Sequence, residues 1–241
     1  MVEVRESLSA ATGRTDWTES LGLKIPILTR QVNSIPDSIE VAKEVSLQGH
    51  LLQRWGSRSL AWRIFLGLLP VTPAVDGESL KVQWVRETRA QRTRWAALEK
   101  SMSLIAIAQQ TKNFNPLAPA KTSQDDKASA EKEMKDLIKQ DVSRTLQEFN
   151  YFHRVETKDL LMTLLFLWGR QNPDYGYKQG MNEILAIVLI VFDTERVASG
   201  GDKRDWSGLS DEEIASAHCM EYLFDASANK ADIYACFDRI L

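Results

Sequence analysis

An arginine and a glutamine, 35 positions apart, are the residues whose types and spacing best suit chemistry in this sequence. Arg144 ends a block that begins at Ile138, and Gln179 lies in a second block that runs from Tyr177 to Asn182. One apolar, helix-like segment separates the blocks, which lets them meet at one site. A guanidinium beside a carboxamide can stabilise phosphoryl charge and position an attacking water. Neither group is a nucleophile or a proton shuttle, so the pair does not predict a conventional hydrolase.

The same residues also have a purely structural interpretation. Arg144 lies at or just past the end of a predicted helix, where a cation offsets the negative helix end. Asp141, three residues earlier, can pair with it on the same face. Gln179 lies at the start of the apolar helix predicted at 177–192 and can satisfy local donors there, with Gly180 serving close packing. On residue type and spacing alone, this structural interpretation is the favoured one.

The chain has the composition of one large domain with a full core, because 44% of its 241 residues are hydrophobic and 26% are charged. Its net charge of −3 is too small to predict a polyanionic partner, so no nucleic acid is expected. Cys219 and Cys236 are too few for a disulfide framework and favour a reducing compartment. The longest apolar run, 184–192, is too short to span a bilayer. These features predict a cytoplasmic protein.

Helical periodicity dominates the chain, which shows no hairpin signal and no repeat, so the predicted class is all-α. Residues 1–36 are expected to be a partly ordered lead-in, and 37–241 a helical domain with a flexible insertion at about 111–130. Because the chain ends inside an amphipathic helix, we expect a longer domain that is truncated at its C-terminus. The helices are expected at 37–56, from a cap at Ser57 to Pro70, at 79–110, from about Ala130 to Arg144, and at 158–168, 177–192, 211–224 and 231–241.

Two features of these helices have competing interpretations. Arg58 and Trp62, four residues apart, share a helix face, and a packed pair is favoured over a direct role in chemistry. A basic stretch between 81 and 100 could bind nucleic acid or acidic lipid, but Trp84 and Trp95 within it are expected in the core. A solvated helix face is therefore favoured for its cations, which are Lys81, Arg86, Arg89, Arg92, Arg94 and Lys100.

Three short blocks together resemble the TBC-domain family, the GTPase-activating proteins for Rab GTPases. Residues 58–62 resemble the R-x-x-x-W block, and 138–144 are similar to the I-x-x-D-x-x-R block. Residues 177–179 match Y-x-Q, extended by Gly180, Met181 and Asn182. Each block alone is short, but all three occur in order, at family-like spacing, in an all-helical chain. The resemblance covers about residues 45–241 and implies a multi-helical TBC-type domain, of which this chain would hold the N-terminal part.

The resemblance implies a role for each site residue. Arg144 would be an arginine finger that reaches in trans to GTP on a Rab, and Gln179 a second finger that orients the attacking water. Asp141 would hold Arg144, while Tyr177 and Asn182 would brace the glutamine segment. The other supporting residues would be Arg58, Trp62 and Gly180.

The resemblance also implies partners and a location. The domain would need no cofactor of its own, because Mg²⁺ and GTP would arrive on the partner Rab in its GTP state. This fits the sequence, which has no G-x-x-x-x-G-K-[ST] loop and no metal spacing among its three histidines. The expected role is in vesicle trafficking, in the cytoplasm and peripherally on endomembranes through the partner.

The sequence departs from the family pattern in two places. Leu146 and Gln147 stand where the family often has an aromatic residue and a proline, and the Arg58 block lacks the usual Gly-Ile/Val-Pro lead-in. The backbone that enters the finger is therefore expected to differ. Two other functions stay open beside the GTPase activator. One is a non-catalytic Rab-binding or scaffold module with the same fold, and the other is a helical nucleic-acid or lipid binder that uses residues 81–100.

Overall fold

The computed structural model describes residues 43–44, 46–49, 57–71, 77–111, 123–198 and 205–241, with side chains described outside 103–111 and 123–127. Throughout these residues the regular elements are helices, without a strand, which confirms the predicted all-α class. The expected lead-in and most of the helix expected at 37–56 lie outside the described residues. Within the described part, no helix is both long and apolar enough to cross a membrane.

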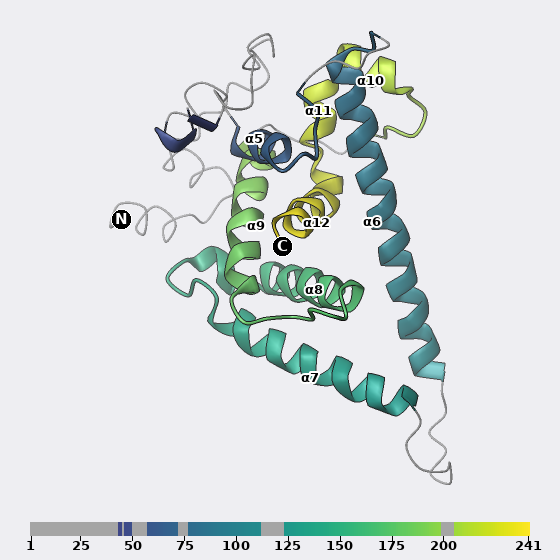
Figure 1. Ribbon diagram of the computed structural model, residues 1–241, viewed down its shortest axis with the longest axis vertical. Helices are drawn as coiled ribbons and strands as arrows, with labels where there is room; N and C mark the ends of the chain where they lie inside the picture. The colour runs from purple at the N-terminus through teal and green to yellow at the C-terminus, as the bar shows by residue number, and fades with distance from the viewer. Residues whose placement is uncertain (1–42, 45, 50–56, 72–76, 112–122, 199–204) are drawn as a thin grey trace. The chain divides into compact units, whose positions relative to one another are not determined.

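The chain forms two compact units, and the boundaries between them fall within two of its helices. The first unit holds the described residues up to Arg92 together with Ile187–Leu241, and the second unit is Thr93–Ala186. The elements, shown in Figure 1, are α5 (Arg58–Phe65), α6 (Leu80–Thr111), α7 (Ser123–Arg144), the 3₁₀ helix η1 (Asn150–His153), α8 (Val155–Gln171), α9 (Met181–Ala198), α10 (Asp211–Ala217), α11 (Cys219–Leu223), the 3₁₀ helix η2 (Ala226–Ala228) and α12 (Asn229–Ile240).

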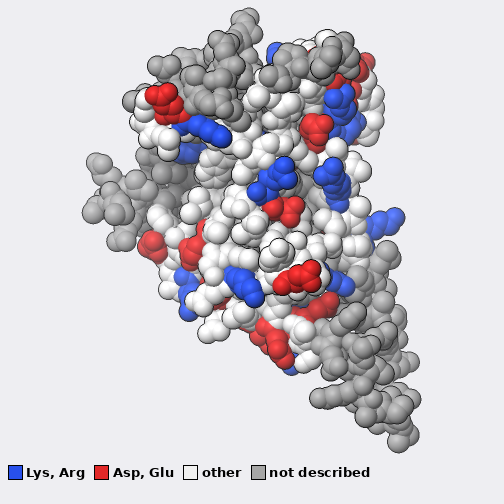
Figure 2. All heavy atoms as spheres, in the orientation of Figure 1, with Lys and Arg blue, Asp and Glu red and all other residues white. Residues whose placement is uncertain are grey.

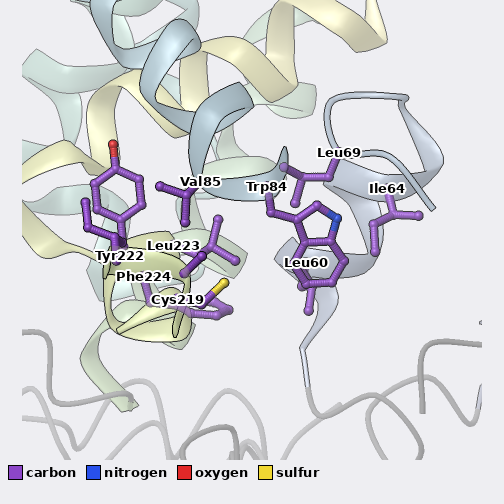
Figure 3. Close-up of a cluster of buried hydrophobic side chains, with 11 residues drawn as sticks. Leu60, Ile64, Leu69, Trp84, Val85, Cys219, Tyr222, Leu223 and Phe224 are labelled. Atoms are coloured by element: carbon purple, nitrogen blue, oxygen red, sulfur yellow. The ribbon is translucent and has the colours of Figure 1, made fainter. Parts of the chain in front are cut away.

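The core of the first unit forms where α5, the start of α6 and α11 pack together (Figure 3). Trp84 is fully buried there, and its indole N–H donates to the carbonyl oxygen of Pro70 at 2.8 Å. The prediction that Trp84 is a core residue is therefore confirmed, and burial of this large side chain includes a partner for its polar atom. The cluster consists of Leu60, Ile64, Leu69, Trp84, Val85, Ile214, Ala215, Cys219, Tyr222, Leu223 and Phe224.

Helix α5 begins as predicted but ends earlier than the prolines that were expected to stop it. The side chain of Ser57 accepts a hydrogen bond from the backbone N–H of Leu60, which is an N-cap. The helix ends at Phe65 because Gly67 adopts a φ of 70°, and the amide of the next residue, Leu68, donates to the carbonyl of Arg63 at 2.8 Å. This is the Schellman arrangement, which a glycine allows at low cost.

One buried carboxylate ties α12 to α5 and α6 in the first unit. Asp232 is 3% exposed and accepts ion pairs from Arg63 at 3.1 Å and from Arg92 at 2.8 Å. Arg89 likewise pairs with Asp211 at 2.8 Å. The expectation that all six cations of residues 81–100 lie on a solvated face is therefore wrong for Arg92, whose guanidinium is drawn inward by a carboxylate far away in the sequence. The exposed cations of the set are Lys81, Arg86, Arg94 and Lys100.

In the second unit, α7 packs against α8 (Figure 1). Gly169 of α8 makes this approach close, since a Cβ atom there would lie 2.8 Å from the sulfur of Met134 on α7. The same Cβ would lie 3.2 Å from the backbone nitrogen of Tyr177. A glycine at this position therefore lets α7 and the segment that precedes α9 share the surface of α8.

Several predicted boundaries shift in the structure. Helix α7 begins at Ser123, before the expected start near Ala130, so it includes the last part of the predicted insertion, while 112–122 lie outside the described residues. The Ser, Asp and Gln residues that resembled a loop are also typical of a helix N-terminus. Helix α8 is longer than predicted at both ends, and α9 continues to Ala198, into a predicted loop. The helix expected at 211–224 is broken at His218 into α10 and α11.

Candidate functional site

The end of α7 holds Arg144 on a buried anchor. Arg144 is the last residue of the helix, and its Nη2 lies 2.5 Å from Oδ1 of Asp141, one turn earlier. The side chain of Asp141 is 1% exposed, whereas that of Arg144 is 52% exposed. This confirms the predicted pairing on one helix face. One end of the guanidinium, Nη2, is thus held by a buried carboxylate, while half of the side chain is exposed to solvent.

The chain leaves α7 through an unusual backbone conformation. Leu146 has a φ of 41°, and among the described residues it is the non-glycine residue with a positive φ. Such a conformation costs a non-glycine residue about 1–2 kcal/mol. Leu146 also stands where the sequence departs from the family pattern. An altered backbone was expected from this departure, and a difference from the family's backbone here stays a prediction.

Gln179 lies in a turn, whereas the sequence predicted the start of a helix there. Helix α9 begins at Met181, and Gly180 has a φ of 100°, which is not helical. Gly176, which follows a separate turn at 173–175, has a φ of 61°. Glycine adopts such angles readily. The side chain of Gln179 is exposed, so its carboxamide is presented to solvent on a short segment between two glycines.

A buried hydrogen-bond network connects this turn to the end of α7. The hydroxyl of Tyr177 donates to Oδ2 of Asp141 at 2.8 Å and lies 3.2 Å from Oδ1 of Asn182. Nδ2 of Asn182 donates to the hydroxyl of Thr145 at 2.9 Å. The backbone N–H of Gly180 donates to Oδ1 of Asn182 at 3.2 Å. The segments that carry Arg144 and Gln179 are therefore joined through side chains that are themselves buried.

The protonation state of Tyr177 suits its role as a donor. Burial raises the pKa of its hydroxyl, and the hydrogen bond and negative charge of Asp141 raise this pKa further. The phenol therefore keeps its proton throughout the neutral range. Because Asp141 accepts from both Tyr177 and Arg144, one carboxylate connects the exposed guanidinium to the inner network.

Glu183 is a titratable group at the edge of the site. It follows Asn182, whose Nδ2 lies 3.3 Å from Oε1 of Glu183. Desolvation raises the pKa of Glu183, and the negative charges of Glu148 and Asp141 raise it further. Glu183 was not predicted from the sequence, because its neighbour Glu148 belongs to a segment 35 positions away.

Arg58 and Trp62, which were predicted to support the site, lie in the first unit, whereas the network lies in the second. Both side chains are half-buried. What the structure records at this block is a carboxylate at the N-terminus of α5. Glu195 is 1% exposed and accepts from the backbone amides of Arg58 at 2.6 Å and Ser59 at 3.0 Å. The support that Arg58 and Trp62 would give to the site stays a prediction.

Glu195 and Thr145 were not predicted from the sequence to have a part in these networks. Two hydroxyls, those of Ser57 and Ser59, also donate to Oε2 of Glu195 at 2.6 Å each. A signal was present, since a glutamate that follows the apolar run of α9 must find donors if it is buried. Thr145 directly follows Arg144, but nothing local to it points to a partner 37 positions away.

Comparison with known proteins identifies the class. The model of the Rab-GTPase-TBC domain family matches residues 57–241, which is most of the chain. The chain therefore belongs to the Rab-GTPase-TBC domain family, as the three sequence blocks had predicted.

Several curated proteins are similar to the chain. TBC1 domain family member 5 of Homo sapiens is 29% identical over 189 residues, which cover 76% of this chain and 22% of that protein. TBC1 domain family member 5 homolog B of Dictyostelium discoideum is 26% identical over 184 residues, covering 76% of this chain and 16% of that protein. TBC1 domain family member 22B of Homo sapiens is 28% identical over 90 residues, covering 35% of this chain and 18% of that protein. The chain thus spans about a fifth of the length of these relatives. No solved structure matches it significantly.

Proposed function

We propose that this chain accelerates GTP hydrolysis on a Rab-type small GTPase by supplying Arg144 and Gln179 in trans. The observation that carries the proposal is the network described above, which joins the two segments bearing these residues while leaving both side chains toward solvent. An arginine and a glutamine so arranged suit a transition state whose charge lies on a transferring phosphoryl group and whose nucleophile is water.

The two residues have separate tasks in this mechanism. Arg144 stabilises the charge that develops on the phosphoryl oxygens, because its planar guanidinium can donate two parallel hydrogen bonds. Its contact with Asp141 uses Nη2, and among the described residues Nη1 and Nε have no hydrogen-bond partner. Gln179 positions the attacking water through its carboxamide, which can donate and accept at once. Mg²⁺ and GTP belong to the partner, and membrane association follows from the partner as well.

The mixed charge of the surface supports a protein partner over nucleic acid. On the face shown in Figure 2, acidic and basic side chains of the described residues are interspersed. Arg89 and Arg92, which had suggested an anionic ligand, are already paired with Asp211 and Asp232. Binding to a nucleic acid relies on cations that neutralise phosphates and so displace the counterions condensed on them, and cations already paired with carboxylates contribute little to that.

The test is stimulated hydrolysis of GTP across a panel of purified Rab proteins, comparing the wild type with Arg144→Ala. Arg86→Ala is a matched control, because the side chain of Arg86 is 50% exposed and its Nη1 pairs with Glu78 at 2.5 Å. We expect the wild type and Arg86→Ala to stimulate at least one Rab equally, and Arg144→Ala to lose the stimulation by about 10³-fold or more. Binding of a GTP-loaded Rab without any stimulation would instead favour the non-catalytic Rab-binding module.

A further inference from the structure

Thr145, the residue after Arg144, occupies a central place in the buried network. Its side chain is 2% exposed, and its hydroxyl lies 2.9 Å from Nδ2 of Asn182 and 3.0 Å from the carbonyl oxygen of Asp141. We propose that Thr145 is a positioning residue, which fixes the segment of Gln179 by orienting the side chain of Asn182. This inference rests on the proposed function, because it assigns Thr145 to the same reaction.

The direction of each hydrogen bond follows from one backbone donor. The N–H of Gly180 can only donate, and it lies 3.2 Å from Oδ1 of Asn182, so this oxygen faces the turn. The NH₂ group of Asn182 must then face Thr145, whose hydroxyl accepts from it and gives its own proton to the carbonyl of Asp141. The second amide hydrogen of Asn182 has an acceptor in Oε1 of Glu183, at 3.3 Å.

This orientation matters because the backbone next to Gln179 is not held by its own preferences. Gly180 has a φ of 100°, which glycine permits but does not enforce. The bond from its N–H to Asn182 is therefore a constraint that keeps the turn in one conformation. Without the hydroxyl of Thr145, the NH₂ group of Asn182 would face an apolar group inside the protein, and rotation of that side chain would release Gly180.

The position of the water-orienting carboxamide is the quantity that this constraint controls. Catalytic groups displaced by about an ångström lose much of their effect, so a loosened turn should lower kcat. Thr145 and Asn182 are 2% and 4% exposed and offer little surface to a partner. The KM for the Rab should therefore change little, which separates a positioning role from a binding role.

The first experiment replaces the hydroxyl alone. Thr145→Val keeps the side-chain shape without the hydroxyl, and Thr145→Ser restores the hydroxyl without the methyl group. Thr194→Val is the matched control, since Thr194 is also 2% exposed and also donates to the carbonyl four residues earlier, that of Ile190. On a responsive Rab, we expect Thr145→Val to lower kcat about tenfold or more with KM within about twofold. Thr145→Ser should recover most of that loss, and Thr194→Val should show none.

The second experiment asks whether the effect passes through Gln179. In a Gln179→Ala background there is no carboxamide left to position, so adding Thr145→Val should lower kcat by less than about twofold more. A further tenfold loss in that background would overturn the proposal. So would a kcat for Thr145→Val equal to that of the wild type, or a Thr145→Ser variant as impaired as Thr145→Val.

A third measurement needs no partner and separates this inference from the proposed function. Hydrogen exchange of the peptide 178–183 should be faster in Thr145→Val than in the wild type, and near the wild-type rate in Thr145→Ser and Thr194→Val. If the wild type stimulates no Rab, the proposed function fails, yet the exchange rates still decide whether Thr145 holds this segment. Unchanged exchange in Thr145→Val would overturn the positioning role, whatever the activity of the wild type.

Discussion

The hydroxyl of Tyr177 donates a hydrogen bond to Asp141 at 2.8 Å, although 36 positions separate the two residues in the sequence. Asp141 uses its other oxygen to hold Arg144. One buried carboxylate therefore has two partners, an inner phenol and an outer guanidinium. This relationship joins the end of α7 to the segment before α9, and the following predictions test it and the elements around it.

Removing the Tyr177 hydroxyl should destabilise the second unit. Tyr177→Phe leaves Oδ2 of a 1% exposed carboxylate without its donor, and a buried unsatisfied acceptor costs about 1–3 kcal/mol. The free energy of unfolding, measured by urea denaturation, should fall by that amount. Tyr175→Phe is the control two residues away, because Tyr175 is 70% exposed and should lose almost nothing. Equal stability of the two variants would contradict the bond.

The two proposed finger residues should act as one unit. If Arg144 and Gln179 serve a single transition state, removing either should remove most of the stimulated hydrolysis, and the double variant should be little worse than the single ones. The measurement is kcat/KM for Arg144→Ala, Gln179→Ala and the double variant. Gln171→Ala, at the exposed last residue of α8, is the control for Gln179→Ala. Losses that simply multiply would show that the residues act independently.

At position 146, a glycine variant should be more stable than an alanine variant, which is the reverse of the usual order. The φ of 41° at Leu146 is strained for any residue with a Cβ atom, so Leu146→Gly should be more stable than Leu146→Ala by about 1 kcal/mol. Leu160 is the opposite case, a half-buried residue inside α8. There Leu160→Ala should be more stable than Leu160→Gly by about 1 kcal/mol. The same order at both positions, measured by chemical denaturation, would argue against strain at Leu146.

Glu195 should be hard to replace, even by glutamine. Its two oxygens accept four hydrogen bonds from the N-terminus of α5. In a glutamine, an NH₂ group would replace one of these oxygens and would face a hydrogen-bond donor. We expect Glu195→Gln to lower the free energy of unfolding by about 2–3 kcal/mol. The exposed residue Glu212 supplies the control, and Glu212→Gln should change stability by less than about 0.5 kcal/mol.

Glu183 should make the protein less stable as the pH rises. Its pKa is raised in the folded state, so the folded protein binds this proton more tightly than the unfolded chain does. The resulting stability is fully present below the unfolded pKa of about 4.3 and is lost as the pH rises through the higher folded pKa. Glu183→Gln removes the charge but keeps an acceptor for Asn182. Its melting temperature should exceed that of the wild type at pH 7, and this excess should shrink toward pH 4.

The sequence by itself determined what depends on neighbours along the chain. The uninterrupted α6, the N-cap of α5 at Ser57 and the pairing of Asp141 with Arg144 all follow from helical spacing and local hydrogen-bonding chemistry. The family also followed from the sequence, because its three blocks are short patterns in a fixed order. Helix ends were less certain where glycine set them, since a positive φ at Gly67 or Gly180 leaves no mark beyond the glycine itself.

Only the tertiary structure decided which distant polar groups satisfy one another. Glu195 binds the hydroxyl of Ser57 across 138 positions, and Asn182 binds Thr145 across 37. Arg92 turned inward because Asp232 is buried 140 positions away and needs a counter-charge. Each of these residues is of a type that is most often exposed to solvent. Packing removes them from water, a buried polar group must then find a partner, and the partner depends on which helices pack together.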